Sequence, residues 1–349
     1  MTITIIVGGQ FGSEGKGKIT GYLAPEFKMA IRSGGPNAGH TVEHDGKVYK
    51  LRMVPCAFFN PKCLLGVAAG AVIDTSVILS EIAACNLNEK RLLIDPQAVI
   101  IEERHKQAEA NLVKAIASTG EGVGSASADK VARVENLHLA RDVPELKRYL
   151  GDVAKAANHM LDAGGKVLLE GTQGFGLSLH HGFYPFVTSR DTTAGALCSE
   201  VGVSPRFVED IILVVRTYPI RVGGNSGPLK NEITWEDLTV KSNSPTALLE
   251  RTTVTGRIRR VGNFNMNLVK RAVMINRPTQ IALTFVDYID HRNFGTSTYR
   301  DLTASAKRFI KRLETETKVP VTLIGTGPIS TNIIDLRKEK SAKVAPQCR

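Results

Sequence analysis

Short aliphatic runs alternate along the chain with longer segments in which apolar residues recur at helical spacing. The runs predict strands at residues 3–7, 167–169, 211–215, 280–284 and 321–324, with strand-like segments at 47–58, 64–74 and 91–101. The amphipathic segments predict helices at residues 18–30, 78–87, 102–117, 143–163, 265–276 and 301–317. This succession, in a chain of 349 residues, indicates an α/β protein of one large domain or two smaller ones.

A glycine-rich loop follows the first predicted strand. Residues 8–18 contain five glycines after Val7, with Glu14, Lys16 and Lys18 among them. Glycine lets backbone N–H groups approach an anion closely, and lysine supplies the countercharge. The loop therefore predicts a phosphate-binding site at the start of the following helix.

Gly12 to Lys18 also spells G-x4-G-K, the core of the P-loop signature. The next residue is Ile19, where that signature requires a Ser or Thr hydroxyl for Mg²⁺. An ordinary P-loop is thus incomplete, and a purely structural glycine turn is the alternative interpretation.

Further polar clusters follow in chain order. Residues 34–41 place Asn37 and His40 among small residues, and His40 is either a general acid or base or a solvated loop residue. Residues 118–124 form a second glycine-rich loop, which follows a predicted helix and so makes a poor dinucleotide fingerprint. Residues 170–174 end a predicted strand, where open α/β sheets bind ligands. Residues 251–260 hold four arginines among threonines, which suits a dicarboxylate as well as a solvated basic face.

Composition narrows the classes of protein that fit. A hydrophobic fraction of 42% and a charged fraction of 23% are ordinary for a globular chain, and no apolar run approaches the ~20 residues that span a bilayer. The N-terminal segment lacks the pattern of a signal peptide, so we expect a cytoplasmic protein with no membrane partner. The five scattered cysteines form no C-x-x-C pair, which excludes the usual zinc-site spacings.

The net charge of +11 fits phosphorylated small-molecule substrates as well as nucleic acid. No basic stretch is interleaved with aromatics, so we expect no nucleic-acid partner.

In chain order, these stretches resemble the motifs of the adenylosuccinate synthetases: GGQFGSEGKGK, GGPNAGHT, STGEGVG, DKVAR, EGTQG, YPFVTS, TTAG, VTGRIRR and GTGP. The resemblance covers the chain from end to end. It implies a single domain over residues 1–336, with a large, mostly parallel central sheet flanked by helices. Residues 337–349 are expected to form a frayed tail.

The resemblance also implies a Mg²⁺-dependent ligase that works in two steps. A nucleoside triphosphate phosphorylates the purine 6-oxygen, and the amine of L-aspartate then displaces that phosphate. In this family the loop histidine stabilises the 6-oxygen, a loop aspartate takes the N1 proton and binds Mg²⁺, and a dimer shares its sites.

The matching positions fall into five groups. The catalytic group is Ser13, Lys16, His40 and Gln173. The monophosphate group is Ser13, Asn37, Thr119, Arg133, Gln173, Thr188 and Arg257, with Arg133 reaching the partner subunit's nucleotide. The aspartate group is Thr253, Val254, Thr255, Gly256, Arg257 and Arg259. The triphosphate group is Gly12, Ser13, Glu14, Gly15, Lys16, Gly17, Thr41, Arg259, Phe285, Asp287, Gly325, Gly327 and Pro328. The metal group is Ser13 and the carbonyl of Gly39.

Two positions depart from the family pattern. Ser13 stands where the loop sequence G-D-E-G-K-G-K has its aspartate, and serine is a poor proton acceptor and a weak Mg²⁺ ligand. Phe285 stands where the guanine-reading T-K-x-D has its lysine. Both changes resemble the phage branch of the family, which makes the precursor of 2-aminoadenine (diaminopurine) DNA from dGMP with ATP or dATP.

Three hypotheses remain open at this point. The leading one is ligation of aspartate to C6 of dGMP with ATP or dATP, in the host cytoplasm if a phage encodes the chain. The second is a standard synthetase that uses IMP and GTP and tolerates Ser13 through a metal-bound water. The third is a catalytically inactive nucleotide-binding homologue, which the retained His40, Lys16 and Gln173 argue against.

Overall fold

A nine-stranded sheet runs through the middle of the molecule. The computed structural model describes residues 2–252 and 256–341. The strand order is β16-β15-β14-β10-β1-β9-β2-β5-β7, and neighbouring strands pair in parallel except β15 with β16. The bounds in this order are Ile333–Asp335, Val321–Gly325, Gln280–Thr284, Val208–Arg216, Thr2–Gly8, Lys166–Glu170, Met29–Arg32, Leu64–Val67 and Leu92–Ile94. The predicted α/β fold with a large, mostly parallel sheet is confirmed.

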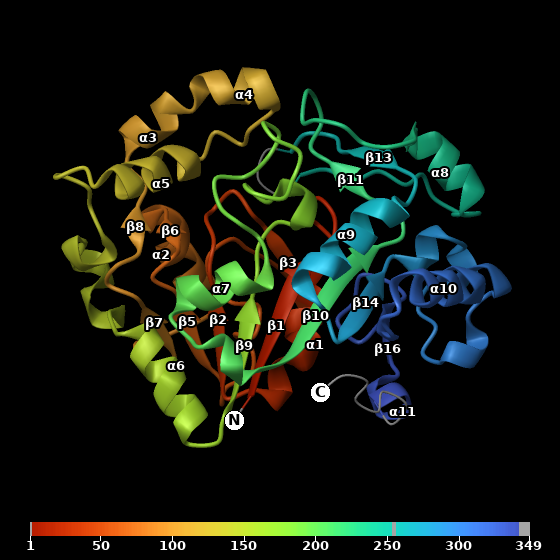
Figure 1. Ribbon diagram of the computed structural model, residues 1–349, viewed down its shortest axis with the longest axis horizontal. Helices are drawn as coiled ribbons and strands as arrows, with labels where there is room; N and C mark the ends of the chain where they lie inside the picture. The colour runs from red at the N-terminus through yellow and green to blue at the C-terminus, as the bar shows by residue number, and fades with distance from the viewer. Residues whose placement is uncertain (1, 253–255, 342–349) are drawn as a thin grey trace.

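The first strand, β1, lies at the centre of this sheet (Figure 1). It pairs in parallel with β9 on one side and β10 on the other. Its side chains alternate: Ile3, Ile5 and Val7 join one hydrophobic cluster, and Ile6 joins the cluster on the opposite face. Because both faces of β1 are covered, a short apolar run without polar alternation is stable there.

Helices cover both faces of the sheet. The first cluster contains residues of α6, α7, α9 and α10, and α7 and α9 lie in front of the sheet in Figure 1. The second cluster contains residues of α1 and α2 on the other face. The helices run over Lys16–Leu23 (α1), Thr75–Ala84 (α2), Glu103–Ala108 (α3), Ala110–Ile116 (α4), Val123–Ala132 (α5), Val153–Asp162 (α6), Ala194–Val201 (α7), Trp235–Lys241 (α8), Met266–Asn276 (α9), Ala304–Thr317 (α10) and Arg337–Ser341 (α11).

Smaller sheets lie outside this core. The hairpin β3–β4 follows the segment that contains Asn37, and β6 pairs with β8. A three-stranded sheet has the order β11-β13-β12; β11 and β12 precede the arginine-rich segment 251–260, and β13 begins at its last residue. The bounds are His40–His44 (β3), Lys47–Leu51 (β4), Val72–Ile73 (β6), Val99–Ile100 (β8), Ile220–Arg221 (β11), Glu232–Ile233 (β12) and Arg260–Gly262 (β13). No helix of the described residues is both long and apolar enough to cross a bilayer.

Several predicted elements were too long. The helix expected at 18–30 ends at Leu23, and Met29–Arg32 forms β2 in the sheet interior. The helix expected at 143–163 begins only at Val153, because Pro144–Tyr149 forms a 3₁₀ segment. The segment 47–58 is a strand only to Leu51.

The C-terminal segment also differs from the expectation. Residues 337–341 form α11, and Arg337 pairs with Glu26 and Asp335, which fixes this part of the tail against the domain. The remainder of the predicted frayed tail, residues 342–349, lies outside the described residues.

Candidate active site

A cleft opens beside the carboxyl ends of the central strands. The described residues that line it are Phe11, Gly12, Ser13, Lys16, Asn37, Ala38, Gly39, His40, Thr119, Gln173, Leu177, Ile220, Arg221, Val222, Thr252 and Arg259. Residues predicted from five separate motifs therefore lie around one cavity.

The side chain of Glu14 holds the glycine-rich loop in its conformation. Its carboxylate is fully buried and accepts the backbone N–H groups of Gln10 and Gly12 at 3.0 and 2.8 Å. Lys16 donates to the second carboxylate oxygen at 2.5 Å. A Cβ on Gly174 would lie 2.3 Å from this carboxylate, so only glycine fits there. Glu14 therefore holds the loop conformation, and its role in triphosphate binding stays a prediction.

Ser13 precedes Glu14 in this loop and lines the cleft. It is exposed and has a left-handed backbone with φ of 59°. Its carbonyl oxygen accepts a hydrogen bond from Arg216 Nη1 at 3.1 Å. The hydroxyl at position 13 thus faces the cleft on a fixed backbone.

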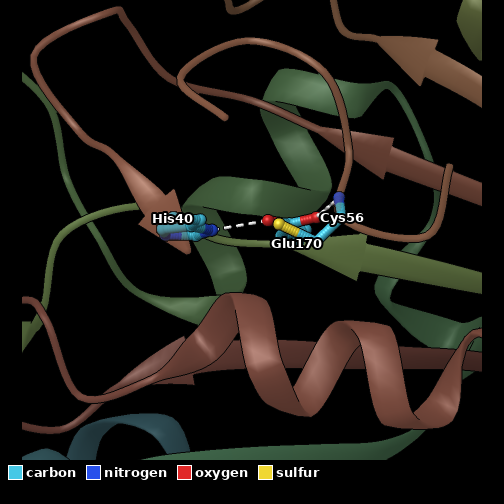
Figure 2. A group of neighbouring side chains, drawn as sticks. All are labelled: His40, Cys56 and Glu170. Atoms are coloured by element: carbon cyan, nitrogen blue, oxygen red, sulfur yellow. Dashed lines mark hydrogen bonds and ion pairs between the residues drawn. The ribbon is translucent and has the colours of Figure 1, made fainter. Parts of the chain in front are cut away.

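His40 begins β3 and is hydrogen-bonded to Glu170, the last residue of β9 (Figure 2). Nδ1 of His40 lies 2.5 Å from Oε1 of Glu170, and Oε2 of Glu170 accepts the backbone N–H of Cys56 at 2.7 Å. Burial and the nearby Arg32 guanidinium lower the pKa of His40 to about 4, so the imidazole is neutral near pH 7. His40 Nε2 is buried and has no hydrogen-bond partner among the described residues.

The side chains of His40, Cys56 and Glu170 also offer metal-type ligand atoms within 4.8 Å of one another. Both Glu170 oxygens, however, already accept hydrogen bonds, and Arg32 Nη1 lies 3.4 Å from Oε1. Burial raises the pKa of the Cys56 thiol, which opposes the thiolate that a metal would need. Glu170, held by the backbone N–H of Cys56, therefore orients the His40 ring by a hydrogen bond and is not a metal ligand in this arrangement.

Gln173 and Asn37 also line the cleft and contact each other. Gln173 Nε2 donates to Asn37 Oδ1 at 3.2 Å, and Thr172 Oγ1 donates to Gln173 Oε1 at 2.6 Å. Gln173 has a left-handed backbone with φ of 55°, which turns the chain directly after β9. Its amide is thus oriented in advance of any ligand.

Arg216, at the end of β10, connects three parts of the site. Besides the Ser13 carbonyl, its fully buried guanidinium pairs with Glu250 through both of its terminal nitrogens. Its central carbon lies 3.8 Å from the centre of the Phe285 ring, a cation–π contact. Nearby, burial raises the pKa of Asp287, and its Oδ1 has no hydrogen-bond partner among the described residues.

Other predicted residues lie away from the cleft lining. Arg133 directly follows α5 as its C-cap residue and is exposed, and Thr188 Oγ1 is buried without a hydrogen-bond partner in the described chain. Thr41 and Pro328 are exposed, and Lys18 ties the segment of Gly327 to α1 through that residue's carbonyl at 2.5 Å. Thr253, Val254 and Thr255 of the predicted aspartate group lie outside the described residues.

The sequence analysis did not single out Arg32, Arg216 or Glu250, and it included Glu170 only as part of the polar segment 170–174. Each is a charged residue at or near the end of an apolar strand or beside the arginine-rich segment. A buried charge requires a partner, so a charge directly after a buried strand was the available signal. The identity of the partner depends on the fold and could not be read from the sequence.

Known proteins resemble the whole chain. The family model described as adenylosuccinate synthetase matches residues 5–141 and 135–294. The adenylosuccinate synthetase of Methanocaldococcus jannaschii is 45% identical over 348 residues, which cover 97% of this chain and 98% of that protein. The chain belongs to the adenylosuccinate synthetase family. It is accordingly a ligase that forms a C–N bond between aspartate and a purine nucleotide.

Further comparisons place this synthetase among its relatives. The adenylosuccinate synthetase of Archaeoglobus fulgidus is 44% identical and covers 97% of this chain and 100% of that protein. The fully ligated adenylosuccinate synthetase from Plasmodium falciparum has a TM-score of 0.86 at 23% identity, covers 96% of this chain and 100% of its own, and shows the fold alone. The cyanophage S-2L succinoaminodeoxyadenylate synthetase, bound to dGMP and dATP as an energy donor, has a TM-score of 0.82 at 29% identity and covers 98% of this chain and 97% of its own.

Proposed function

We propose that this synthetase joins L-aspartate to C6 of dGMP, with ATP or dATP as the phosphoryl donor. The observation that carries the proposal is Ser13, whose small side chain lines the same cleft as His40 and Gln173. Guanine differs from hypoxanthine by a 2-amino group next to N1. A hydroxyl at position 13 leaves room for that group, whereas an aspartate there would be larger and charged. The cyanophage neighbour bound to dGMP supports the same choice.

The proposed chemistry has two steps. The 6-oxygen attacks the γ-phosphorus and the nucleoside diphosphate leaves, which converts a poor leaving group into a good one. The aspartate amine then adds at C6 and inorganic phosphate departs, giving the N-succinyl purine nucleotide. Lys16 lines the cleft close to the loop that would hold the triphosphate, and Arg259 borders it from the arginine-rich segment.

The described residues partly fit the expected Mg²⁺. The carbonyl of Gly39 and the hydroxyl of Ser13 are oxygen donors at the cleft wall, but the lining contains no carboxylate among the described residues. Magnesium commonly takes several ligands from substrate phosphates and water, so Ser13 and Gly39 would complete such a shell. When bound, the ion would neutralise charge on the triphosphate.

A second candidate is the standard reaction with IMP and GTP. The archaeal adenylosuccinate synthetases, at 44–45% identity over nearly their whole length, support this candidate more directly than the first. The two candidates share the fold, the cleft and the ligase chemistry. They differ in the monophosphate that binds beside Ser13, dGMP or IMP, and in the triphosphate that binds beside Phe285, ATP or dATP against GTP.

The deciding experiment incubates the protein with Mg²⁺ and aspartate, with dGMP or IMP, and with ATP, dATP or GTP in turn. Mass spectrometry then identifies the succinyl nucleotide. We expect product from dGMP with ATP or dATP. Product from IMP and GTP alone would replace the first candidate with the second, and no product from any combination would contradict both.

Phe285 gives a separate prediction about the triphosphate. Its half-buried ring rests on Arg216, and stacking of a base on an aromatic ring contributes about 1–3 kcal/mol. We expect Phe285→Ala to raise the KM for ATP roughly 10-fold, with a smaller change in the KM for dGMP. Steady-state kinetics with each substrate varied in turn measures this, and Phe285→Tyr, which keeps the ring, is the matched control. An unchanged KM for ATP would remove Phe285 from the triphosphate site.

A further inference from the structure

The Ser13 position leaves one step of the reaction without an assigned residue. The 6-oxygen becomes a good nucleophile when the neighbouring N1 loses its proton, and a neutral hydroxyl accepts protons poorly. The described lining of the cleft holds no carboxylate. Its cationic side chains, Lys16, Arg221 and Arg259, are donors without a free lone pair. His40 is the remaining side chain in that lining with a basic lone pair.

The hydrogen bonds of His40 determine where that lone pair lies. A carboxylate only accepts hydrogen bonds, so the 2.5 Å contact with Glu170 places the imidazole proton on Nδ1. Nε2 then carries the lone pair, and Nε2 is the buried atom without a partner in the described chain. The backbone N–H of Cys56, at 2.7 Å from the other Glu170 oxygen, fixes the carboxylate in this orientation. The charged groups around the pair are Arg32, 3.4 Å from Glu170, and Lys16 on the neighbouring helix.

We propose that Nε2 of His40 removes the N1 proton of the purine nucleotide, and that Glu170 is the positioning residue that holds the proton of the neutral ring on Nδ1, so that Nε2 is the atom with the lone pair. This inference rests on the proposed ligase function and assigns the base for its first step. The N1–H bond breaks and an Nε2–H bond forms. The released electron pair moves through C6 onto the 6-oxygen, which bonds to the γ-phosphorus as the nucleoside diphosphate leaves.

The same geometry gives the imidazolium a second task. N1 and the 6-oxygen are attached to the same carbon, so an Nε2–H formed at N1 lies within reach of the oxygen beside it. The imidazolium then donates to the oxygen on which negative charge develops, and Glu170 stabilises the positive ring from the other side. One histidine can thus replace both the missing aspartate base and the donor to the 6-oxygen.

The test compares wild type with His40→Ala over a range of pH, using whichever monophosphate the wild type converts. Both dGMP and IMP carry an N1 proton. At neutral pH we expect kcat of the variant to be lower by roughly 10²-fold or more. As the pH approaches the N1 pKa of the free nucleotide, measured by titration, the substrate loses this proton to solvent. The ratio of wild-type to variant kcat should therefore fall with rising pH.

A ratio that stays constant with pH would overturn the inference, because the defect of the variant would then not depend on whether N1 of the substrate still carries its proton. Glu170→Gln should give the same falling ratio from a smaller starting loss, with the KM for the monophosphate nearly unchanged. His138→Ala, which removes a largely exposed histidine paired with Glu102, is the control and should follow the wild-type profile. Circular dichroism at each pH confirms that the variants are folded. If wild type forms no succinyl product from either nucleotide, the proposed function fails and the inference fails with it.

Discussion

Replacing Ser13 by aspartate is expected to reverse the choice of purine nucleotide. In Ser13→Asp, kcat/KM for dGMP should fall by roughly 10²-fold, which corresponds to about 2.7 kcal/mol, and activity on IMP should rise. The added carboxylate, held by the metal and by N1, would crowd the 2-amino group of guanine. Hypoxanthine lacks that group and would be accepted.

The backbone supports this substitution as a clean test. Residue 13 has φ of 59°, a conformation in which aspartate is among the better tolerated residues. The side chain is exposed, so a larger group meets no packed core. The loop below it stays held by Glu14 and Arg216.

The measurement is kcat/KM for dGMP and for IMP with wild type, Ser13→Asp and Ser13→Ala. The alanine variant keeps the space beside the base and should retain the preference for dGMP. Unchanged dGMP turnover in Ser13→Asp would remove the steric argument for Ser13. The standard reaction with IMP and GTP would then be the better supported candidate.

The second large effect concerns Arg133, which we expect to complete the site of a partner subunit. Arg133 directly follows α5 with a left-handed backbone, is exposed, and does not line the described cleft of its own chain. Val131 and Val134, close to it in sequence, are 80% and 39% exposed, as expected of a surface that a second copy covers. A guanidinium there can hold a 5′-phosphate through two parallel hydrogen bonds.

Arg133→Ala and His40→Ala should each be nearly inactive alone, and a mixture of the two should recover activity. A heterodimer of the variants contains one site with neither defect. Random exchange in a symmetric dimer makes about half of the dimers heterodimers, so recovery should approach about one quarter of wild type.

Differently tagged chains report whether subunits have exchanged, and Arg141→Ala, an exposed arginine beyond the same helix, is the control that should keep full activity. Mixtures that exchange and remain as inactive as the separate variants would show that Arg133 does not act across a subunit boundary.

The central part of the fold could be predicted because its signal is local. The run from Ile3 to Val7, followed by two glycines, has the composition of a strand buried on both faces, and the structure places it there. The segment at 143–163 was harder, since its helical periodicity continues through residues that form a 3₁₀ turn after Pro144. Periodicity records which side chains face the core and says less about where backbone hydrogen bonds begin.

The site divides in a similar way. Ser13, Lys16, Asn37, His40 and Gln173 could be proposed from their motifs, and the structure brings them to one cleft. The pairs His40–Glu170 and Arg216–Glu250 join residues 130 and 34 positions apart, so no local pattern connects them. Glu170 and Arg216 end strands of the central sheet, but His40 begins the separate β3–β4 hairpin and Glu250 lies outside the strands, so only the folded chain brings each pair together.

The contacts of Arg216 have a thermodynamic consequence. One guanidinium holds the Ser13 carbonyl, stacks on Phe285 and pairs with Glu250, whose carbonyl accepts the backbone N–H of Arg259 at 2.9 Å. A ligand that shifts this guanidinium at one of these places changes its interactions at the others. Linkage requires the effect to be reciprocal: if the triphosphate strengthens aspartate binding by some factor, aspartate strengthens triphosphate binding by the same factor. The affinity for each substrate then depends on which of the other substrates are bound. Each affinity must therefore be measured with the others present and with the others absent.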